Sequence, residues 1–251
     1  MVIYEYDFVK KVVFRLNKCI GVIGGMGPLA TCDFMKKLLL RMDAKSDQEF
    51  IRISVDCNTN IPDRTAAILG KGENPLPEMI KSAIRLQCSG ADVLTISCNT
   101  AHYFVDELSK CVDIPIMHMP LAVAEELKNR HIKTAAVLAT DGTVQSGVYE
   151  KVLNAKGIQT VYPDKTEQAF IMSLIYDYVK AGKPFETCRD RILELINHMK
   201  ALGAEIMILG CTELPIVFDQ LNINIATIDP TDVLACAAIR YCGGTPKEQF
   251  C

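Results

Sequence analysis

Two cysteines stand at the ends of apolar runs and could carry acid–base chemistry. Cys98 follows the run Val93–Ile96 after one serine. Cys211 follows the run Ile206–Leu209 after one glycine. A helix is expected to begin after each cysteine, where backbone N–H groups and the helix dipole lower the pKa of a thiol. The matched placement therefore favours two reactive thiols, and buried structural cysteines are the alternative.

Two thiols on opposite sides of a cleft suit the inversion of a carbon that carries a hydrogen. One sulfur removes a proton from one face while the other delivers a proton to the opposite face, and the roles exchange with the enantiomer bound. This chemistry requires no metal or redox cofactor. Because the α-proton of an amino acid is only weakly acidic, the site must neutralise the α-carboxylate and stabilise the developing carbanion electrostatically.

Basic and polar residues that could hold a carboxylate occur in suitable places. Arg64 lies in the turn-rich stretch NTNIPDRT, so we expect it on a loop at the cleft rim, where its planar fork suits a carboxylate. A surface ion pair with Asp63 is the alternative. Lys180 ends a predicted helix, and a lysine that only stabilises the helix dipole is its alternative. Further amide and hydroxyl donors flank the cysteines at Asn99, Thr100 and Thr212.

The four histidines give weaker evidence of a catalytic role. His102 follows Cys98 by four residues, so on a first helical turn it could orient the thiol or simply pack. The other three, His118, His131 and His198, show no spacing to a catalytic partner. A proteolytic Cys–His pair therefore has no support.

A glycine-rich turn follows the first apolar run, in CIGVIGGMGPLA. Gly25, Gly27 and Ala30 satisfy the spacing of a dinucleotide-binding turn, and Asp56 could serve as its ribose-binding acid. Asp56 comes about 30 residues after the glycines, however, whereas about 20 are expected. The fingerprint alone is weak, and we expect the loop to approach a small carboxylate rather than a pyrophosphate.

Composition narrows the possible partners and location. The 251 residues carry a formal net charge of −3 without a Lys/Arg block, which argues against nucleic acid or a membrane surface as partner. No apolar run reaches the ~18–20 residues of a membrane span. The eleven cysteines form no C-x-x-C motif or Cys/His cluster, so we expect no metal site and a reducing, cytoplasmic location. Residues 1–18 lack a signal-peptide pattern and are expected to be an amphipathic extension.

Short β-branched runs alternate with helical patterns along the chain, which predicts α/β architecture with parallel sheets covered on both faces. Ligands of such sheets lie beyond the carboxyl ends of the strands, where the cysteines fall. The predicted strands are Ile20–Ile23, Ile51–Val55, Val93–Ile96, Thr134–Leu138 and Ile206–Leu209, with weaker ones at Pro115–Met117, Gln159–Val161 and Asn224–Ile228. The predicted helices include Leu29–Met42, Pro77–Gln87 and Thr187–Leu202.

The two halves of the chain resemble each other. IGVIGGMGPLATCDFMKKLL resembles AAVLATDGTVQSGVYEKVLN, and DVLTISCNTAHYFV resembles EIMILGCTELPIVF. Two related α/β domains facing each other would bring both strand-end cysteines to one cleft. The alternative is the general self-similarity of α/β proteins.

The motifs SCNTAH and GCTELP together resemble those of the aspartate/glutamate racemases, a family that needs no pyridoxal phosphate. GGMGPLAT, IPDRTAAILGKGE, SGVYEK and YVKAG extend the likeness toward aspartate racemases, from about Cys19 to Val233. The resemblance implies two pseudo-symmetric Rossmann-like domains, a site between them and a homodimer. We place one domain at residues 1–117 plus 225–251 and the other at 118–224. The extension before Cys19 departs from the family pattern.

By motif match, Cys98 and Cys211 take the places of the catalytic pair, and Arg64 and Lys180 those of the residues that bind the substrate's carboxylates. The positions that match the substrate pocket are Met26, Asn99, Thr100, Thr140 and Thr212. Because both thiols are present, the resemblance implies reversible action on both enantiomers.

The leading hypothesis is cofactor-independent racemisation of aspartate. Glutamate racemase, hydantoin racemase and maleate isomerase are alternatives within the superfamily. A non-catalytic amino-acid-binding module and a nucleotide-dependent oxidoreductase are the alternatives outside it. Two cations favour a dicarboxylic amino acid, but one methylene changes discrimination by only ~1–3 kcal/mol, so the choice between aspartate and glutamate stays open.

Overall fold

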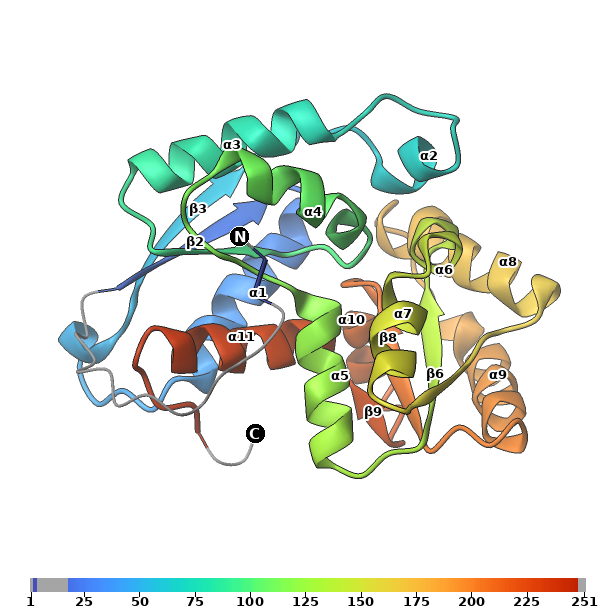
Figure 1. Cartoon of the computed structure of the whole chain (residues 1–251). Helices are drawn as coiled ribbons and strands as arrows, with labels where there is room; N and C mark the ends of the chain where they lie inside the picture. Colours follow the sequence, from blue (N-terminus) through green and yellow to red (C-terminus); the bar gives the residue numbers. More distant parts are fainter. Residues whose placement is uncertain (1, 4–17, 248–251) are drawn as a thin grey trace.

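The computed structural model describes residues 2–3 and 18–247, which form two parallel β-sheets flanked by helices (Figure 1). The first sheet has the strand order β1-β5-β4-β2-β3, with β1 Val2–Ile3, β2 Cys19–Gly24, β3 Arg52–Cys57, β4 Val93–Ile96 and β5 Ile116–Met117. The second has the order β7-β6-β8-β9, with β6 Thr134–Ala139, β7 Gln159–Val161, β8 Ile206–Gly210 and β9 Thr227–Ile228. All paired strands run parallel, and the predicted α/β class is confirmed.

The two sheets share one topology. Without the edge strand β1, the first sheet reads β3-β2-β4-β5 and the second β7-β6-β8-β9. Each half therefore starts in an inner strand, moves to one edge, and returns to the other side of the starting strand. Strands β4 and β8, which precede Cys98 and Cys211, occupy equivalent places. This equivalence agrees with the internal repeat inferred from the sequence.

Helices cover both faces of each sheet (Figure 1). On the first sheet, α3 and α4 pack on one face and α1 and α11 on the other, around separate clusters of buried apolar side chains. Their bounds are α1 Pro28–Arg41, α3 Leu76–Cys88, α4 Val105–Leu108 and α11 Pro230–Tyr241. The short helices of this half are α2 Arg64–Ile68 and the 3-10 helices η1 Asp47–Glu49, η2 Thr100–Phe104 and η3 Ser109–Cys111.

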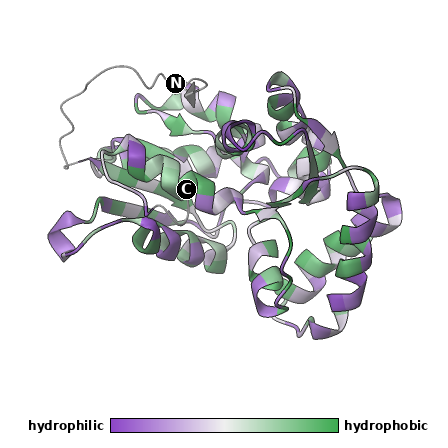
Figure 2. Cartoon of the chain, turned by 90° about the horizontal axis from the view of Figure 1, so that it is seen from below, coloured by the Kyte–Doolittle hydropathy of each residue, from purple (hydrophilic) through white to green (hydrophobic). Residues whose placement is uncertain are grey.

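On the second sheet, α5 and α7 pack on one face, and α8, α9 and α10 on the other. Their bounds are α5 Met119–Asn129, α7 Val148–Ala155, α8 Lys165–Ser173, α9 Arg189–Ala201 and α10 Leu214–Gln220. The remaining helical segments are α6 Asp141–Ser146, the π-helix η4 Leu174–Val179 and the 3-10 helix η5 Glu186–Cys188. Helices of the chain carry both hydrophobic and hydrophilic residues, as one-sided burial requires (Figure 2).

The predicted strands and helices are found, although most of their ends differ by one or two residues. The helix predicted over Thr187–Leu202 begins only at Arg189, because Glu186–Cys188 forms a 3-10 turn first. The strand predicted over Asn224–Ile228 is limited to Thr227–Ile228. The helix expected directly after Cys98 is the 3-10 helix η2 and becomes α-helical only at Val105.

The chain crosses between the two halves twice. It leaves the first sheet after β5 and enters α5, whose first turn is capped by His118. It returns after β9, because α11 packs on the first sheet beside α1. Since β9 pairs with β8, the second sheet extends to Ile228, beyond the residue 224 at which we placed the boundary. The domain division itself stays a prediction.

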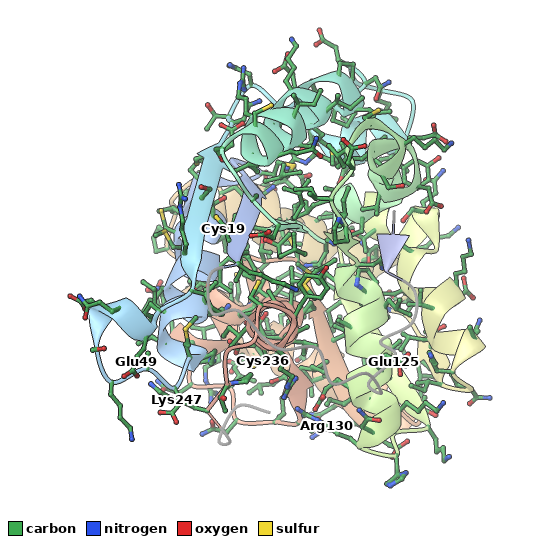
Figure 3. All side chains as sticks on the ribbon, turned by 60° about the vertical axis from the view of Figure 1, so that its left-hand side comes forward. Cys19, Glu49, Glu125, Arg130, Cys236 and Lys247 are labelled. Atoms are coloured by element: carbon green, nitrogen blue, oxygen red, sulfur yellow. The ribbon has the colours of Figure 1, made fainter. Side chains whose placement is uncertain are left out.

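Most of the predicted N-terminal extension lies outside the described residues; within it, the backbone of β1 pairs with β5. The ten cysteines of the described chain form no disulfide, and six of them are buried. Cys19 on β2 and Cys236 on α11 are two of these (Figure 3). Among the described helices, none combines the length and the apolar character that a bilayer crossing requires.

Candidate active site

A narrow pocket lies where the carboxyl ends of β2, β4, β6 and β8 meet. We refer to it as the inter-sheet pocket. It is lined by Met26, Asp63, Arg64, Thr65, Cys98, Asn99, Thr100, Thr140, Tyr176, Lys180, Cys211, Thr212 and Glu213. All nine residues selected from the sequence are in this group. Sequence reasoning missed the other four, which are Asp63, Thr65, Tyr176 and Glu213.

A wider groove opens beside the inter-sheet pocket and shares six of its lining residues. The groove is bordered by the glycine turn and the start of α1, including the exposed Leu29, and by Val179 and Ile216. The pocket is thus reached from outside past the side chains common to both, which are Met26, Asp63, Arg64, Tyr176, Lys180 and Glu213.

The two cysteines are equally buried, each with 6% of its surface exposed, but their charged neighbours differ. The Cys211 thiol donates a hydrogen bond to the Glu213 carboxylate, with Sγ 2.8 Å from Oε2. Burial raises the pKa of Cys211 well above its ordinary value, and Glu213 raises it further, while Lys180 acts in the opposite direction. The lowered pKa expected for this thiol is therefore wrong, because desolvation and an adjacent anion outweigh the start of a helix.

Arg64 is buried and begins a helix, which corrects the loop predicted from its turn-rich surroundings. It is the first residue of α2, a helix capped by the Asp63 carboxylate, which accepts from the N–H of Ala66 at 2.7 Å. Asp63 also accepts from the hydroxyl of Tyr176 at 3.1 Å, so its carboxylate serves the cap and the pocket wall rather than a surface ion pair.

The Arg64 fork is anchored by the backbone. It donates to the carbonyl oxygens of Met26 at 2.8 Å, Pro62 at 2.9 Å and Ile61 at 3.3 Å. Its Nε has no hydrogen-bond partner among the described residues. Burial alone would lower the pKa of Arg64, but the nearby Cys98 sulfur, followed by Asp63, more than offsets burial and raises it. The guanidinium is therefore a fixed cation beside Cys98.

Lys180 directly follows η4, as expected for a residue that ends a helix. Its Nζ lies 3.9 Å from Oε1 of Glu213 and 4.6 Å from the centre of the Tyr176 ring. Burial would lower the pKa of Lys180, but Glu213 and then Cys211 outweigh it and the pKa is raised. The pocket thus holds a second cation, on the side of Cys211.

Hydroxyl groups from both halves of the chain meet at one wall of the pocket. Thr100 lies 3.0 Å from Thr140 and 2.8 Å from Thr143, between side-chain oxygens. Thr65 donates to Thr140 at 3.1 Å, and Thr140 caps α6. A side chain at Gly142 would collide with this wall, since an added Cβ would lie 2.8 Å from Cα of Thr65.

The side chains that follow the two cysteines, Asn99 after Cys98 and Thr212 after Cys211, are also held in place. Asn99 accepts a 2.5 Å hydrogen bond from the hydroxyl of Tyr149, which is fully buried on α7. Its amide Nδ2 has no partner within the described part of the chain. Thr212 donates to Oε2 of Glu213 at 3.1 Å. Asn99 therefore keeps a free donor in the pocket, whereas Thr212 is engaged by Glu213.

The glycine turn is packed against the protein itself. Gly25 has a φ of +86°, and an added Cβ would lie 2.4 Å from the carbonyl group of Asn58. The Gly25 N–H donates to the Thr31 hydroxyl at 2.9 Å. Asp56, the candidate ribose acid, is absent from the lining of both pockets and pairs with Arg85 at 3.3 Å. These contacts give the dinucleotide alternative no support.

His102 contacts the backbone of Cys98. Its Nδ1 donates to the Cys98 carbonyl oxygen at 2.9 Å, and its ring lies 5.3 Å from that of His118. Burial, together with the nearby His118, lowers the pKa of His102 to about 3, so the imidazole is neutral. His102 therefore supports the segment that carries Cys98 through its main chain.

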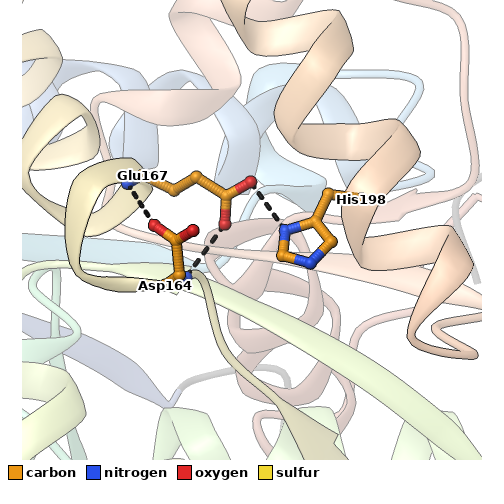
Figure 4. A group of neighbouring side chains, drawn as sticks. All are labelled: Asp164, Glu167 and His198. Carbon is orange, nitrogen blue, oxygen red and sulfur yellow. Dashed lines mark hydrogen bonds and ion pairs between the residues drawn. The ribbon is translucent and has the colours of Figure 1, made fainter.

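His198 lies outside the inter-sheet pocket and contacts a carboxylate. Its Nδ1 lies 2.7 Å from the carboxylate of Glu167, and Glu167 forms a capping box with Asp164 at the start of α8 (Figure 4). The three side chains are close enough to hold a metal ion. The carboxylates are engaged in the cap and the histidine contact, which join α8 to α9, so the group has a structural explanation.

Comparison with known proteins places this geometry in context. The aspartate racemase of Picrophilus torridus superposes with a TM-score of 0.83 at 33% sequence identity, covering 93% of this chain and 98% of that one. The broad specificity amino-acid racemase RacX of Bacillus subtilis (strain 168) is 27% identical over 226 residues, covering 88% and 96% of the two chains. Glutamate racemase from Francisella tularensis subsp. tularensis SCHU S4, solved with D-glutamate, shares the fold at 21% identity, with a TM-score of 0.65 and coverage of 90% and 81%. Residues 23–238 match the family model of the Asp/Glu/hydantoin racemases, and this chain belongs to that family.

Proposed function

We propose that this protein racemises aspartate without a cofactor, using Cys98 and Cys211 as the two proton-transfer groups. The observation that carries the proposal is the meeting of both thiols in one pocket, at equivalent strand ends, with Arg64 and Lys180 beside them. Family membership supports an amino-acid racemase. The likeness to the Picrophilus aspartate racemase favours aspartate over other amino acids.

In the proposed reaction, one sulfur takes the α-proton from one face of the substrate. The other thiol gives its proton to the opposite face, so that the two sulfurs exchange their protonation states as the configuration inverts. The charge that develops on the α-carbon and its carboxylate is stabilised by fixed donors in a site from which most water is excluded. The unpartnered Nε–H of Arg64 and amide of Asn99 are suitable donors.

Two cations match a substrate with two carboxylates. Arg64 and Lys180 are the proposed carboxylate-binding residues, and both remain charged because their pKa values are raised. We propose that the remaining contacts to the substrate come from Met26, Asn99, Thr100, Thr140 and Thr212, which line the same pocket.

Glutamate is the second candidate substrate, and a broad amino-acid specificity is the third. Glutamate racemases occur among the relatives, such as that of Helicobacter pylori (strain Shi470), which is 28% identical over 136 residues. The B. subtilis relative is described as a broad-specificity racemase. An extra methylene changes selectivity by only ~1–3 kcal/mol, so the substrate must be assigned by measurement.

The test is incubation of the purified protein with L-Asp, L-Glu or L-Ala in D₂O, with EDTA and without added cofactor. Loss of the α-proton signal in NMR and appearance of the D-enantiomer in chiral chromatography are expected for L-Asp. The double variant Cys98→Ala/Cys211→Ala serves as the inactive control. The proposal would be contradicted if exchange of the α-proton requires added pyridoxal phosphate. It would also be contradicted if no dicarboxylic amino acid exchanges its α-proton.

Two further properties are proposed, one from the family resemblance and one from the cysteines. We propose a homodimer, to be tested by light scattering coupled to size-exclusion chromatography. A mass corresponding to one chain would contradict it. We propose a cytoplasmic location because no disulfide joins any of the cysteines of the described residues, and fractionation of the source cells tests this location.

A further inference from the structure

Glu213 is the one buried carboxylate that directly contacts a cysteine sulfur among the described residues. It has 6% of its surface exposed and lies two residues after Cys211. One oxygen, Oε2, accepts from the Cys211 thiol at 2.8 Å and from the Thr212 hydroxyl at 3.1 Å. The other, Oε1, faces Lys180 at 3.9 Å. The carboxylate is therefore held against the sulfur from two sides.

The two sulfurs face charges of opposite sign. Cys98 lies beside the guanidinium of Arg64, whose own pKa is raised by this sulfur after the lowering effect of burial is overcome. Cys211 lies beside the carboxylate of Glu213. A cation favours a thiolate next to it, whereas an anion favours a neutral thiol.

We infer that Glu213 is a positioning residue that holds Cys211 as a protonated, hydrogen-bonded thiol. The inference rests on the proposed function, because it concerns the starting state of the two-thiol reaction. The empty enzyme then rests with a hydrogen-bonded thiol at Cys211, which is placed to give its proton to the substrate.

The other groups around Cys211 do not cancel this effect. Lys180, at the end of η4, is the cation that faces Cys211, and its Nζ is shared with Glu213. Tyr149 on α7 is neutral, because burial raises its pKa well above the ordinary value. The Arg64 guanidinium is anchored on three carbonyl oxygens on the Cys98 side. Glu213 is thus the charge in direct contact with the Cys211 sulfur.

The proton balance gives the two directions of the reaction different starting points. From the resting form, the Cys98 sulfur takes the α-proton and the Cys211 S–H gives its proton to the other face of the carbon. After the product has dissociated, Cys98 is protonated and Cys211 is a thiolate next to the Glu213 carboxylate. This second form is the less favoured one, and it returns to the resting form when one proton leaves Cys98 and one is bound at Cys211.

The experiment measures the alkylation rate of each cysteine by iodoacetamide, from pH 6 to pH 10, using peptide mass spectrometry on the intact protein without substrate. In the wild type, the Cys211 rate is expected to rise with pH to beyond pH 9. Glu213→Gln keeps the size and the oxygen acceptor but removes the charge, so the Cys211 rate at pH 7.5 is expected to increase at least tenfold, the equivalent of one pKa unit. The rate at Cys98 is expected to change less than threefold.

Asp63→Asn is the matched control, since it removes another carboxylate of the same pocket and asparagine still caps α2. It should leave the Cys211 rate within a factor of two. An unchanged Cys211 profile in Glu213→Gln would overturn the inference. If that variant does not fold, the wild-type profile decides, because a Cys211 rate that reaches its plateau below pH 8 also overturns it. None of these measurements needs racemase activity, so a failure of the proposed function is recognised separately in the D₂O assay.

Discussion

Replacing Arg64 by lysine tests whether its fork, rather than its charge alone, builds the pocket. The guanidinium donates to three carbonyl oxygens, of Met26, Ile61 and Pro62, and so links the glycine turn to the start of α2. A lysine ammonium at the same position keeps the positive charge, but it is a compact point charge on a flexible stem. It can retain one of these contacts at most with good geometry.

The expected size of the effect follows from the two lost contacts. Hydrogen bonds to charged groups are worth roughly 1.5–3 kcal/mol each, and a water molecule admitted by the shorter side chain can replace part of the loss. We therefore expect the free energy of unfolding of Arg64→Lys to fall by about 2–4 kcal/mol. Since the carboxylate of the substrate would also lose its planar donor, kcat/KM for aspartate should fall about 10- to 100-fold, corresponding to ~1.4–2.8 kcal/mol.

Urea denaturation followed by circular dichroism measures the first effect, and chiral chromatography of L- and D-Asp measures the second. Arg85→Lys is the matched control, because the Arg85 side chain is 60% exposed and makes a surface ion pair with Asp56. Its change in unfolding free energy should stay below about 1 kcal/mol. If Arg64→Lys is as stable as this control and has wild-type kcat/KM, the fork is dispensable and the assigned role of Arg64 is wrong.

Three further predictions concern the cysteines, the second cation and the buried histidines. Cys98→Ala and Cys211→Ala should each abolish racemisation in the chiral assay with a native circular dichroism spectrum, and near-wild-type turnover in either would exclude the two-thiol mechanism. Lys180→Ala should cost about 2–5 kcal/mol in kcat/KM for aspartate without creating activity on alanine, and a change of less than about threefold would contradict its role. His118, whose pKa is lowered to about 4 mainly by burial, binds its proton at lower pH than the unfolded chain does, so stability should decline as the pH falls from 6.5 to 4. His118→Asn keeps a cap on α5 and should reduce this decline by up to about 1.4 kcal/mol per pH unit. The unfolding free energy of both proteins is measured by urea denaturation at each pH, and the same pH dependence in both would refute the assignment.

The positions of the two cysteines could be predicted because the signals are local. An apolar run that stops at a small or polar residue marks the end of a buried strand, and parallel strands place their carboxyl ends on one edge. That argument located Cys98 and Cys211 without any knowledge of the rest of the fold. The same locality explains why the internal strands were predicted almost to the residue.

Burial and its consequences could not be derived in this way. Arg64 was expected on a loop at the cleft rim because turn formers surround it. It begins a helix instead, and the cap that Asp63 forms with the N–H of Ala66 could have been indicated by the sequence DRTA. Glu213 stands two residues after Cys211, and its proximity to the strand end was the available signal. Its effect on the pKa of Cys211 depends on how deeply both groups are buried, which no spacing reveals.

Contacts between the two halves were the least predictable part of the site, and they determine how the two thiols face each other. Thr65 and Thr100 come from the first half and meet Thr140, near the end of β6, through their hydroxyl groups. In a second contact between the halves, the Tyr149 hydroxyl from α7 donates a hydrogen bond to the side chain of Asn99, the residue after Cys98. Each of these contacts joins residues at least 40 positions apart in the sequence. The strands bring each sulfur to the edge of its own sheet, and these side-chain contacts between the halves then hold the two edges against each other around the inter-sheet pocket.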